Sequence, residues 1–335
     1  MTKPDLRVAL LGQGFMGKAH SNAYVQAPHF YDLPYRVRRT LLCGRDAAQL
    51  AAMADRWGWE STSTDWRAAI DRRDIDAVDI ALPNHLHAEA AIAAAQAGKI
   101  VLCEKPMALT LEDAEAMAHA ARGVPTMVWY NYRRVPAIAY AHELIQAGRL
   151  GSIFHYDAAY RQQWGPDRSR DGTWKMDPAQ AGSGVADDLL THLIDTALYL
   201  NGRVNEGIAL SRTFVPDRPV DDAFIALLRF ENGSIGTFEA TRFGIGCRNA
   251  NTFQLHGSGG MLRFNLERLN HLEFADAGDP AVEQGTRDML VTDMAHPIFP
   301  NFWKPGHIIG YEHTFIAALA ELLDCLSRGV PFHPD

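Results

Sequence analysis

The segment VALLGQGFMGKAH (residues 8–20) decides the fold of the N-terminal part of the chain. Its apolar start predicts a strand, and Gly12, Gly14 and Gly17 lie between that strand and a predicted helix. Glycine at these positions permits a tight turn, a close approach of the backbone to a pyrophosphate, and close packing of the helix on the strand. The phosphates would then lie at the helix N-terminus. In this strand–loop–helix context the pattern predicts dinucleotide binding rather than an ordinary turn.

The chain around this segment alternates short apolar runs with Ala-rich helical patterns. This alternation is typical of a parallel sheet with crossover helices, and therefore of a Rossmann dinucleotide-binding domain in the α/β class. The expected strands are 8–11, 37–43, 77–82, 100–103 and 127–129, and the expected helices are 16–26, 47–57, 66–71, 87–97 and 111–121.

The pattern changes near residues 126–132, which places a domain boundary there. A helix over 136–147, a strand over 152–162 and a helix over 185–200 come first, and antiparallel hairpins follow at 223–243 and 251–264. A last helix is expected over 311–327. We therefore expect a first domain over 1–128 and a second, α+β domain over 129–335.

Composition excludes several functional classes. A net charge of −8 without a long basic stretch argues against nucleic-acid binding. No apolar run approaches the roughly 20 residues of a membrane span, and the N-terminus starts a strand pattern at once, where a signal peptide would need a charged and an apolar region. Four widely spaced cysteines fit a reducing setting, so we expect a cytoplasmic protein.

The second expected strand ends in Gly44 and Arg45 rather than in the acidic residue that usually holds the ribose 2′-hydroxyl. Arg45 could cover the adenine or pair with a 2′-phosphate, or it could be an ordinary solvated arginine. This favours NADP over NAD without deciding between them. Asp46 is expected to cap the next helix.

The motif PNHLH (residues 83–87) follows the third expected strand, at the sheet edge where open α/β sheets bind ligands. His85 and His87 could form part of a metal site, but no further ligands stand at a suitable spacing, so we expect none. The alternative is a loop along the cofactor, with His87 near the start of a helix.

Two further motifs carry candidate catalytic residues. In CEKP (103–106), Lys105 precedes a proline and is therefore expected to be held in an extended conformation. In GSGVADDLLTH (182–192), Asp188 and His192 are four residues apart on a predicted helix and would share a face. A carboxylate beside a histidine can orient the ring as a general base, although an ordinary amphipathic helix would show the same spacing.

With Gly12-x-Gly14-x-x-Gly17, PNHLH, CEKP and the Asp188–His192 helix in this order, the chain resembles the glucose–fructose oxidoreductase / inositol dehydrogenase / MocA family over essentially its whole length. The resemblance implies a Rossmann domain followed by an α+β domain with a large, mostly antiparallel open sheet, through which members associate as homo-dimers or homo-tetramers. It also implies an NAD(P)-dependent oxidoreductase that acts on a hydroxyl-bearing carbon of a sugar, an anhydrosugar or a polyol.

The resemblance implies that Lys105, Asp188 and His192 form the catalytic group. It places the cofactor site in the glycine loop and the strand ends that follow, at Gly12, Gly14, Phe15, Met16, Gly17, Arg45, Pro83, Asn84, His87, Glu104 and Lys105. The expected substrate site adds aromatic and hydrogen-bonding side chains to the catalytic group, at Lys105, Tyr132, Arg133, Gln162, Trp164, Trp174, Asp188 and His192. Two alternatives stay open: a dinucleotide-binding sensor or scaffold without turnover, and a metal hydrolase that uses His85, His87, Asp188 and His192.

Overall fold

The computed structural model describes residues 3–335, which form two compact units. Unit 1 comprises the chain up to Asn131 together with Tyr311–Asp335, and unit 2 comprises Tyr132–Gly310. The first change of unit lies close to the boundary expected at 128. The last segment differs from the expected division, because Tyr311–Asp335 packs with the first unit rather than the second. Among residues 3–335, none of the helices combines the length and the apolar character that a membrane crossing requires.

Unit 1 contains a six-stranded, all-parallel sheet in the order β3-β2-β1-β4-β5-β6. This is the doubly wound order in which ligands bind where the strand order reverses, here between β1 and β4. The strands are β1 (Asp5–Leu11), β2 (Arg36–Cys43), β3 (Ser61–Ser63), β4 (Ala77–Ile80), β5 (Ile100–Cys103) and β6 (Thr126–Val128). The expected Rossmann fold is therefore confirmed, with the short β3 as an additional strand.

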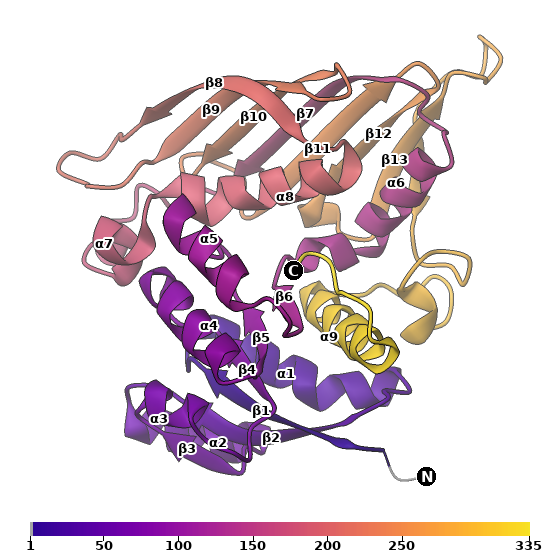
Figure 1. The fold of residues 1–335 in the computed structure, drawn as a ribbon. Coiled ribbons are helices and arrows are strands. Elements are labelled where there is room, and N and C mark those ends of the chain that lie inside the picture. Colours follow the sequence, from indigo (N-terminus) through magenta and orange to yellow (C-terminus); the bar gives the residue numbers. More distant parts are fainter. Residues whose placement is uncertain (1–2) are drawn as a thin grey trace. The chain divides into compact units, whose positions relative to one another are not determined.

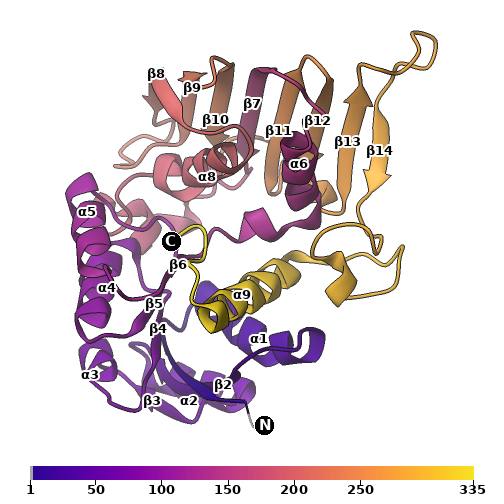
Figure 2. The same ribbon diagram turned by 45° about the vertical axis from the view of Figure 1, so that its right-hand side comes forward.

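The helices of unit 1 cover this sheet (Figures 1 and 2). They are α1 (Phe15–Phe30), α2 (Ala47–Trp57), α3 (Trp66–Ile70), α4 (His87–Gln96), α5 (Leu111–Ala120) and α9 (Tyr311–Arg328). The small side chains of α4, such as Ala90 and Ala94, are fully buried and allow the helix to approach the sheet closely. Asp46 caps α2, as expected, and Thr110 caps α5 by accepting a hydrogen bond from the backbone N–H of Asp113.

The C-terminal helix α9 lies beside α1 in both views (Figures 1 and 2). Asn131 donates a hydrogen bond to the hydroxyl of Thr314 over 2.7 Å, and the backbone N–H of Val128 donates to the carbonyl of Pro334 over 3.0 Å. Phe315 packs against the buried Trp129, with ring centroids 5.8 Å apart. These contacts explain why the end of the chain belongs to unit 1.

Unit 2 contains an eight-stranded sheet in the order β14-β13-β12-β11-β7-β10-β9-β8. Only the β7–β10 pair is parallel, so the expected mostly antiparallel sheet is confirmed. The strands are β7 (Ile153–Arg161), β8 (Val204–Arg212), β9 (Ala223–Phe230), β10 (Ile235–Thr241), β11 (Ala250–Gly257), β12 (Gly260–Asn265), β13 (His271–Asp276) and β14 (Arg287–Leu290).

The helices of unit 2 leave one face of its sheet open. They are α6 (Pro136–Gln146), α7 (Pro178–Ala181), a π-helical turn η5 (Ala186–Leu190) and α8 (Thr191–Leu200). Figures 1 and 2 show α6 and α8 against one face, and no helix within Tyr132–Gly310 covers the opposite face. The helix expected over 185–200 is therefore present, but its first turn is π rather than α. Such single π turns are frequent at functional sites.

Candidate active site

The loop after β1 forms a cradle in which Gly12, Gly14 and Gly17 carry no side chain. A Cβ atom on Gly12 would lie 2.2 Å from the carbonyl oxygen of Ala81, and one on Gly17 would lie 2.1 Å from the carbonyl oxygen of Gly12. Gly14 is exposed at the N-cap of α1 and has no side chain with which to cap the helix. The loop therefore fits a pyrophosphate at the N-terminus of α1.

The next two residues of the loop, Phe15 and Met16, open α1. The Phe15 side chain is 69% exposed and stacks on Tyr311 of α9, with ring centroids 6.4 Å apart. Met16 is half-buried. Both residues directly follow the cradle, as the expected cofactor site requires.

Arg45 is exposed at the end of β2. Next to it, the side chain of Gln13 accepts a hydrogen bond from the backbone N–H of Asp46 over 3.0 Å. A Cβ atom on Gly44 would lie 2.1 Å from Oε1 of Gln13, so this side chain lies directly against Gly44. Arg45 is thus available for the nucleotide contact that the sequence suggests.

The PNHLH loop does not bring its two histidines together. His85 is exposed, whereas His87 is fully buried with Nδ1 2.8 Å from the carbonyl oxygen of Pro106 and Nε2 2.9 Å from that of Leu82. Burial lowers the pKa of His87, although the two carbonyls oppose the shift. Within residues 3–335, no three His, Cys, Asp or Glu side chains form a group that could hold a metal ion. The metal hydrolase alternative therefore has no geometric support.

The same loop gives His87 a supporting role. Its ring links the loop that follows β4 to the loop that follows β5, and Asn84 is also buried, in the short turn before α4. Both ring nitrogens of His87 lie near backbone carbonyls, and its expected contact with the cofactor stays a prediction. Pro83 remains half-buried at the start of the loop.

At the end of β5, Glu104 is buried and Lys105 is half-buried. Oε1 of Glu104 lies 3.0 Å from Nε2 of His20, and Oε2 accepts a hydrogen bond from the backbone N–H of Lys105 over 3.1 Å. The carboxylate of Glu104 thus has internal partners, and its expected cofactor contact stays a prediction. The hydrogen bond to Oε2 holds the backbone of Lys105 in place.

In unit 2, Asp221 fixes the start of the helix that carries Asp188. Its carboxylate accepts hydrogen bonds from the backbone N–H groups of Gly184, Val185 and Ala186, over 2.6, 2.9 and 3.1 Å. A Cβ atom on Gly184 would lie 1.8 Å from the carbonyl oxygen of Asp221, so the approach between the two segments requires glycine there. The glycine at position 184 is thus explained by this backbone contact.

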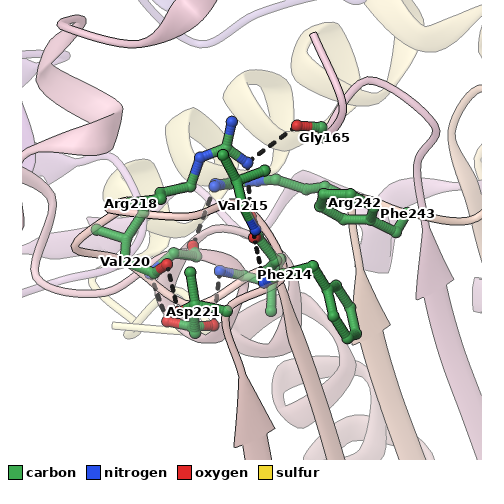
Figure 3. A network of polar contacts seen from close by, with 12 residues as sticks. Gly165, Phe214, Val215, Arg218, Val220, Asp221, Arg242 and Phe243 are labelled. Atoms are coloured by element: carbon green, nitrogen blue, oxygen red, sulfur yellow. Dashed lines mark hydrogen bonds and ion pairs between the residues drawn. The ribbon is translucent and has the colours of Figure 1, made fainter. Parts of the chain in front are cut away.

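A second carboxylate, that of Asp222, holds the neighbouring loop. It accepts hydrogen bonds from the backbone N–H groups of Phe214 and Val215 and from Arg218, which is buried and also donates to the carbonyl of Gly165 (Figure 3). A buried ion pair of this kind keeps one geometry, because moving either charge would leave the other buried without a partner.

Asp188 lies within the π-helical turn and contacts two cations. Nη2 of Arg242 donates to its Oδ2 over 3.0 Å and to the carbonyl of Gly184 over 3.1 Å, and Nζ of Lys175 lies 3.2 Å from its Oδ1. Arg242 is only 1% exposed, and its guanidinium carbon lies 4.5 Å from the ring centroid of Trp164. Nε and Nη1 of Arg242 have no hydrogen-bond partner within residues 3–335, so the cation–π contact with Trp164 compensates part of its desolvation. Arg242 and Lys175 thus hold the carboxylate of Asp188.

Three of the expected substrate residues, Tyr132, Gln162 and Trp164, lie in one chain of contacts. The hydroxyls of Tyr132 and Tyr160 are 3.0 Å apart, and Tyr160 donates to Oδ1 of Asn249 over 2.8 Å. Gln162 donates to the same Asn249 oxygen over 2.8 Å and accepts from Nε1 of Trp164. We call these five residues the Asn249 network.

His192 lies beside this network. Its ring is buried, with its centroid 4.6 Å from that of Tyr132 and 5.8 Å from that of Tyr160. Two aromatic rings of the Asn249 network thus lie against His192, the candidate base.

Arg133 and Trp174, also expected at the substrate site, have other contacts in unit 2. Nε and Nη2 of Arg133 donate to the buried carboxylate of Asp195 at 2.5–3.0 Å, which favours a structural role for this arginine. Burial raises the pKa of Asp195, and Arg133 opposes the shift. Trp174 is half-buried, with Nζ of Lys175 5.8 Å from its ring centroid.

Sequence reasoning missed several residues of the site. Asn249 and Tyr160 come together through the pairing of β7 with β11, in which Asn251 lies opposite Tyr160. Arg242 follows β10 and Asp221 precedes β9, so both reach Asp188 and its helix only through the sheet. No local motif marks these positions.

The chain matches two family models and several known proteins. Residues 6–132 match the model described as the oxidoreductase family with an NAD-binding Rossmann fold, and residues 138–263 match the GFO/IDH/MocA C-terminal domain. Levoglucosan dehydrogenase from Pseudarthrobacter phenanthrenivorans is 39% identical, over 98% of this chain and 91% of the relative.

Solved structures agree with this result. An oxidoreductase domain protein from Kribbella flavida superposes with a TM-score of 0.96 and 42% identity, over 99% of this chain and 92% of that chain. A levoglucosan dehydrogenase in complex with NADH and levoglucosan gives a TM-score of 0.96 and 40% identity, with the same coverage. These relatives favour an enzyme over a sensor or scaffold.

The glycine cradle generates a first prediction. We expect Gly17→Ala to lower the free energy of unfolding by about 1–3 kcal/mol, because its methyl group would overlap the Gly12 carbonyl. It should also weaken NADH binding, measured by titration. Gly14→Ala is the matched control for stability, since a Cβ there meets nothing within 4 Å and φ is −79°. Equal losses of stability in the two variants would contradict this account of the loop.

The contacts of Asp188 generate a second prediction. Arg242→Met should lower the free energy of unfolding by about 3 kcal/mol, because it removes one partner of a buried ion pair. Lys175→Met should cost at most about 1 kcal/mol, since this side chain is 41% exposed. Urea unfolding measures the free energy of unfolding of the two variants. An equal loss in both would contradict the claim that the buried Arg242 contributes more to stability than the more exposed Lys175.

Proposed function

The chain belongs to the GFO/IDH/MocA oxidoreductase family, and on this premise we propose that it is an NAD(P)-dependent dehydrogenase of an anhydrosugar related to levoglucosan. It oxidises a CH–OH group to a carbonyl. The substrate class follows from the likeness to levoglucosan dehydrogenase, which extends over nearly the whole of both chains.

The Asn249 network beside His192 fits this substrate class. The half-buried Trp164 offers a ring face, and the half-buried Gln162 and Asn249 offer amide donors and acceptors, while the buried Tyr160 holds Asn249. A compact anhydrosugar presents the same mixture, with C–H faces between hydroxyl groups. A site built for a purely apolar or an anionic substrate would not need this mixture.

The proposed reaction divides the work among three side chains. Bound in the glycine cradle and against the loops after β2 and β4, the nicotinamide cofactor supplies the acceptor for the hydride that leaves the carbon. His192 takes the proton of the substrate hydroxyl, and Asp188 positions the segment that carries this base. Lys105 stabilises the negative charge that develops on the oxygen. The products are a carbonyl, a reduced cofactor and one proton.

The cofactor preference rests on Arg45. The solved relative binds NADH, whereas an exposed arginine and the absence of an acidic residue at the tip of β2 suit a 2′-phosphate. We propose that the chain accepts NADP as well as NAD through Arg45. Removing Arg45 should then weaken NADP more than NAD.

A substrate screen tests the function. Levoglucosan, other anhydrosugars and inositols are offered with NAD and with NADP, and reduction of the cofactor is followed by its absorbance. We expect levoglucosan or a close anhydrosugar to have the highest kcat/KM. The proposal is wrong if no sugar or polyol is oxidised while NADH still binds.

Lys105→Ala should then lower kcat by about 10²–10⁴, the usual effect of a positioned acid–base group, while NADH binding is retained. His192→Ala should lower kcat more than Asp188→Asn, because the base takes the proton and the acid only positions it. Lys304→Ala, at an exposed position, is the control. A Lys105→Ala variant with the kcat of the wild type would exclude the catalytic role.

We further propose that the chain forms a homo-oligomer through the open sheet face of unit 2. Ile208 pairs with Leu227 and Leu210 pairs with Ile225 across β8 and β9, and all four side chains are more than half exposed. Contiguous apolar surface of this kind marks an interaction site.

The four cysteines Cys43, Cys103, Cys247 and Cys325 are free thiols, which supports a reducing, cytoplasmic setting.

Leu210→Lys tests the oligomer, because a lysine opposite Ile225 introduces a charge into the proposed contact. We expect light scattering to show a smaller assembly than that of the wild type. Ser211→Lys, at the neighbouring exposed position of the same strand, should leave the mass unchanged. A wild type that is monomeric at micromolar concentration would refute the interface.

A further inference from the structure

A fully buried histidine of α1 lies between two buried carboxylates of unit 1. Nδ1 of His20 lies 3.0 Å from Oδ2 of Asp79, and Nε2 lies 3.0 Å from Oε1 of Glu104. His20 and Asp79 are 0% exposed and Glu104 is 5% exposed. The reaction proposed above gives none of these three side chains a role.

Counting protons shows what this geometry requires. A carboxylate oxygen only accepts hydrogen bonds, and a neutral imidazole has a single N–H. A neutral His20 would therefore direct a nitrogen lone pair at one of the two carboxylates across 3.0 Å. An imidazolium donates at both ends and satisfies both contacts. The alternative is a proton on one of the acids.

The surroundings of the pair favour the imidazolium. Asp79 also accepts hydrogen bonds from the Tyr24 hydroxyl over 2.7 Å and from Nε1 of Trp129 over 2.9 Å, so its charged form is well solvated by donors. The ring of Trp129 stacks on that of His20, with centroids 4.3 Å apart, and Phe315 lies 5.6 Å away. An aromatic face stabilises a cation.

The titratable groups around His20 point the same way. Burial lowers the pKa of His20, but Asp79 and Glu104 outweigh this and raise it to about 9. Burial raises the pKa of Tyr24 and of the Cys103 thiol, and the neighbouring carboxylates raise both further, so these two groups stay neutral. His20 is therefore the one cation among the groups named here that can balance the two carboxylates.

The cluster reaches Lys105 through Glu104. Oε1 of Glu104 is bound to His20, and its Oε2 accepts the backbone N–H of Lys105 over 3.1 Å. The backbone N–H of Glu104 donates to the carbonyl of Ile80 over 2.9 Å, which extends the β4–β5 pairing to this residue. The position of Glu104, and with it the backbone of Lys105, is thus fixed from the β4 side and from α1.

We propose that His20 is a positioning residue for Lys105, an imidazolium that ties α1 to the ends of β4 and β5 and so fixes the strand end from which Lys105 acts. The proposal rests on the proposed function for its catalytic part. The charge state of His20 does not depend on that function.

The first test reads the charge state in the cofactor-free wild type. We expect the ¹⁵N NMR signals of His20, assigned through contacts to Trp129, to show both ring nitrogens protonated at pH 7.5. A neutral tautomer at that pH would overturn the proposal. Because this measurement needs neither substrate nor turnover, it remains decisive if the screen for a sugar substrate fails.

The second test uses His20→Gln, with His29→Gln at an exposed position of the same helix as the control. At a temperature where all variants are folded, His20→Gln should lower kcat by about 10- to 100-fold, the effect of a small displacement of a reacting group. The KM for the cofactor should change by no more than about twofold, since the glycine cradle is not altered. A variant that loses only thermal stability and keeps its kcat would show a purely structural role.

The third test is the pH dependence of stability. The folded pKa of about 9 lies above the ordinary value of 6.5, so the folded state binds more protons than the unfolded state between these values. The stabilisation by His20 is complete below pH 6.5 and is lost as the pH rises through 9. The difference in Tm between the wild type and His20→Gln should therefore shrink across this range. A Tm difference that stays constant over this range would contradict the buried imidazolium. The Tm can be measured even if His20→Gln has no activity.

Discussion

Asp79 and Glu104 are carboxylates removed from water, and His20 is the group placed between them. Taking charges out of water is costly, and such a set is stable only in a geometry where every donor meets an acceptor. That constraint joins α1, β4 and the end of β5 at one point of unit 1. The helix whose N-terminus forms the glycine cradle is therefore fixed to the strand end that carries Lys105.

Unit 2 holds its own candidate residues by the same means. Buried Arg242 binds Asp188, and Asp221 caps the π-helical turn in which Asp188 lies. Both units thus use buried charges to fix backbone rather than to bind ligand directly. Lys105 and Asp188, which are proposed to take part in catalysis, belong to the segments that these buried charges fix. Two residues expected to touch cofactor or substrate, Glu104 and Arg133, also contact these buried groups of the protein.

Local sequence patterns were sufficient to predict much of the fold and part of the candidate site. Apolar runs and glycines gave the Rossmann fold, and helix signals placed α6 and α9 to within a residue or two, because these features depend on neighbours in sequence. The packing of α9 with unit 1 depends on contacts such as Asn131 with Thr314, which no local pattern encodes. Asn249 likewise needs the register of β7 with β11, and Asp221 needs the loop before β9 to meet Gly184. Residues that support a site through tertiary contacts leave little trace in the sequence around them.

The central claim is the proposed division of work, in which His192 takes the proton of the substrate hydroxyl and Lys105 stabilises the charge on its oxygen. A crystal structure with NAD and levoglucosan tests it most directly. The account predicts that the Lys105 ammonium and the His192 imidazole both lie within hydrogen-bonding distance of the same sugar hydroxyl, with the Asn249 network against the rest of the sugar. A sugar bound to unit 2 with Lys105 directed elsewhere, or with His192 out of reach of every hydroxyl, would contradict it.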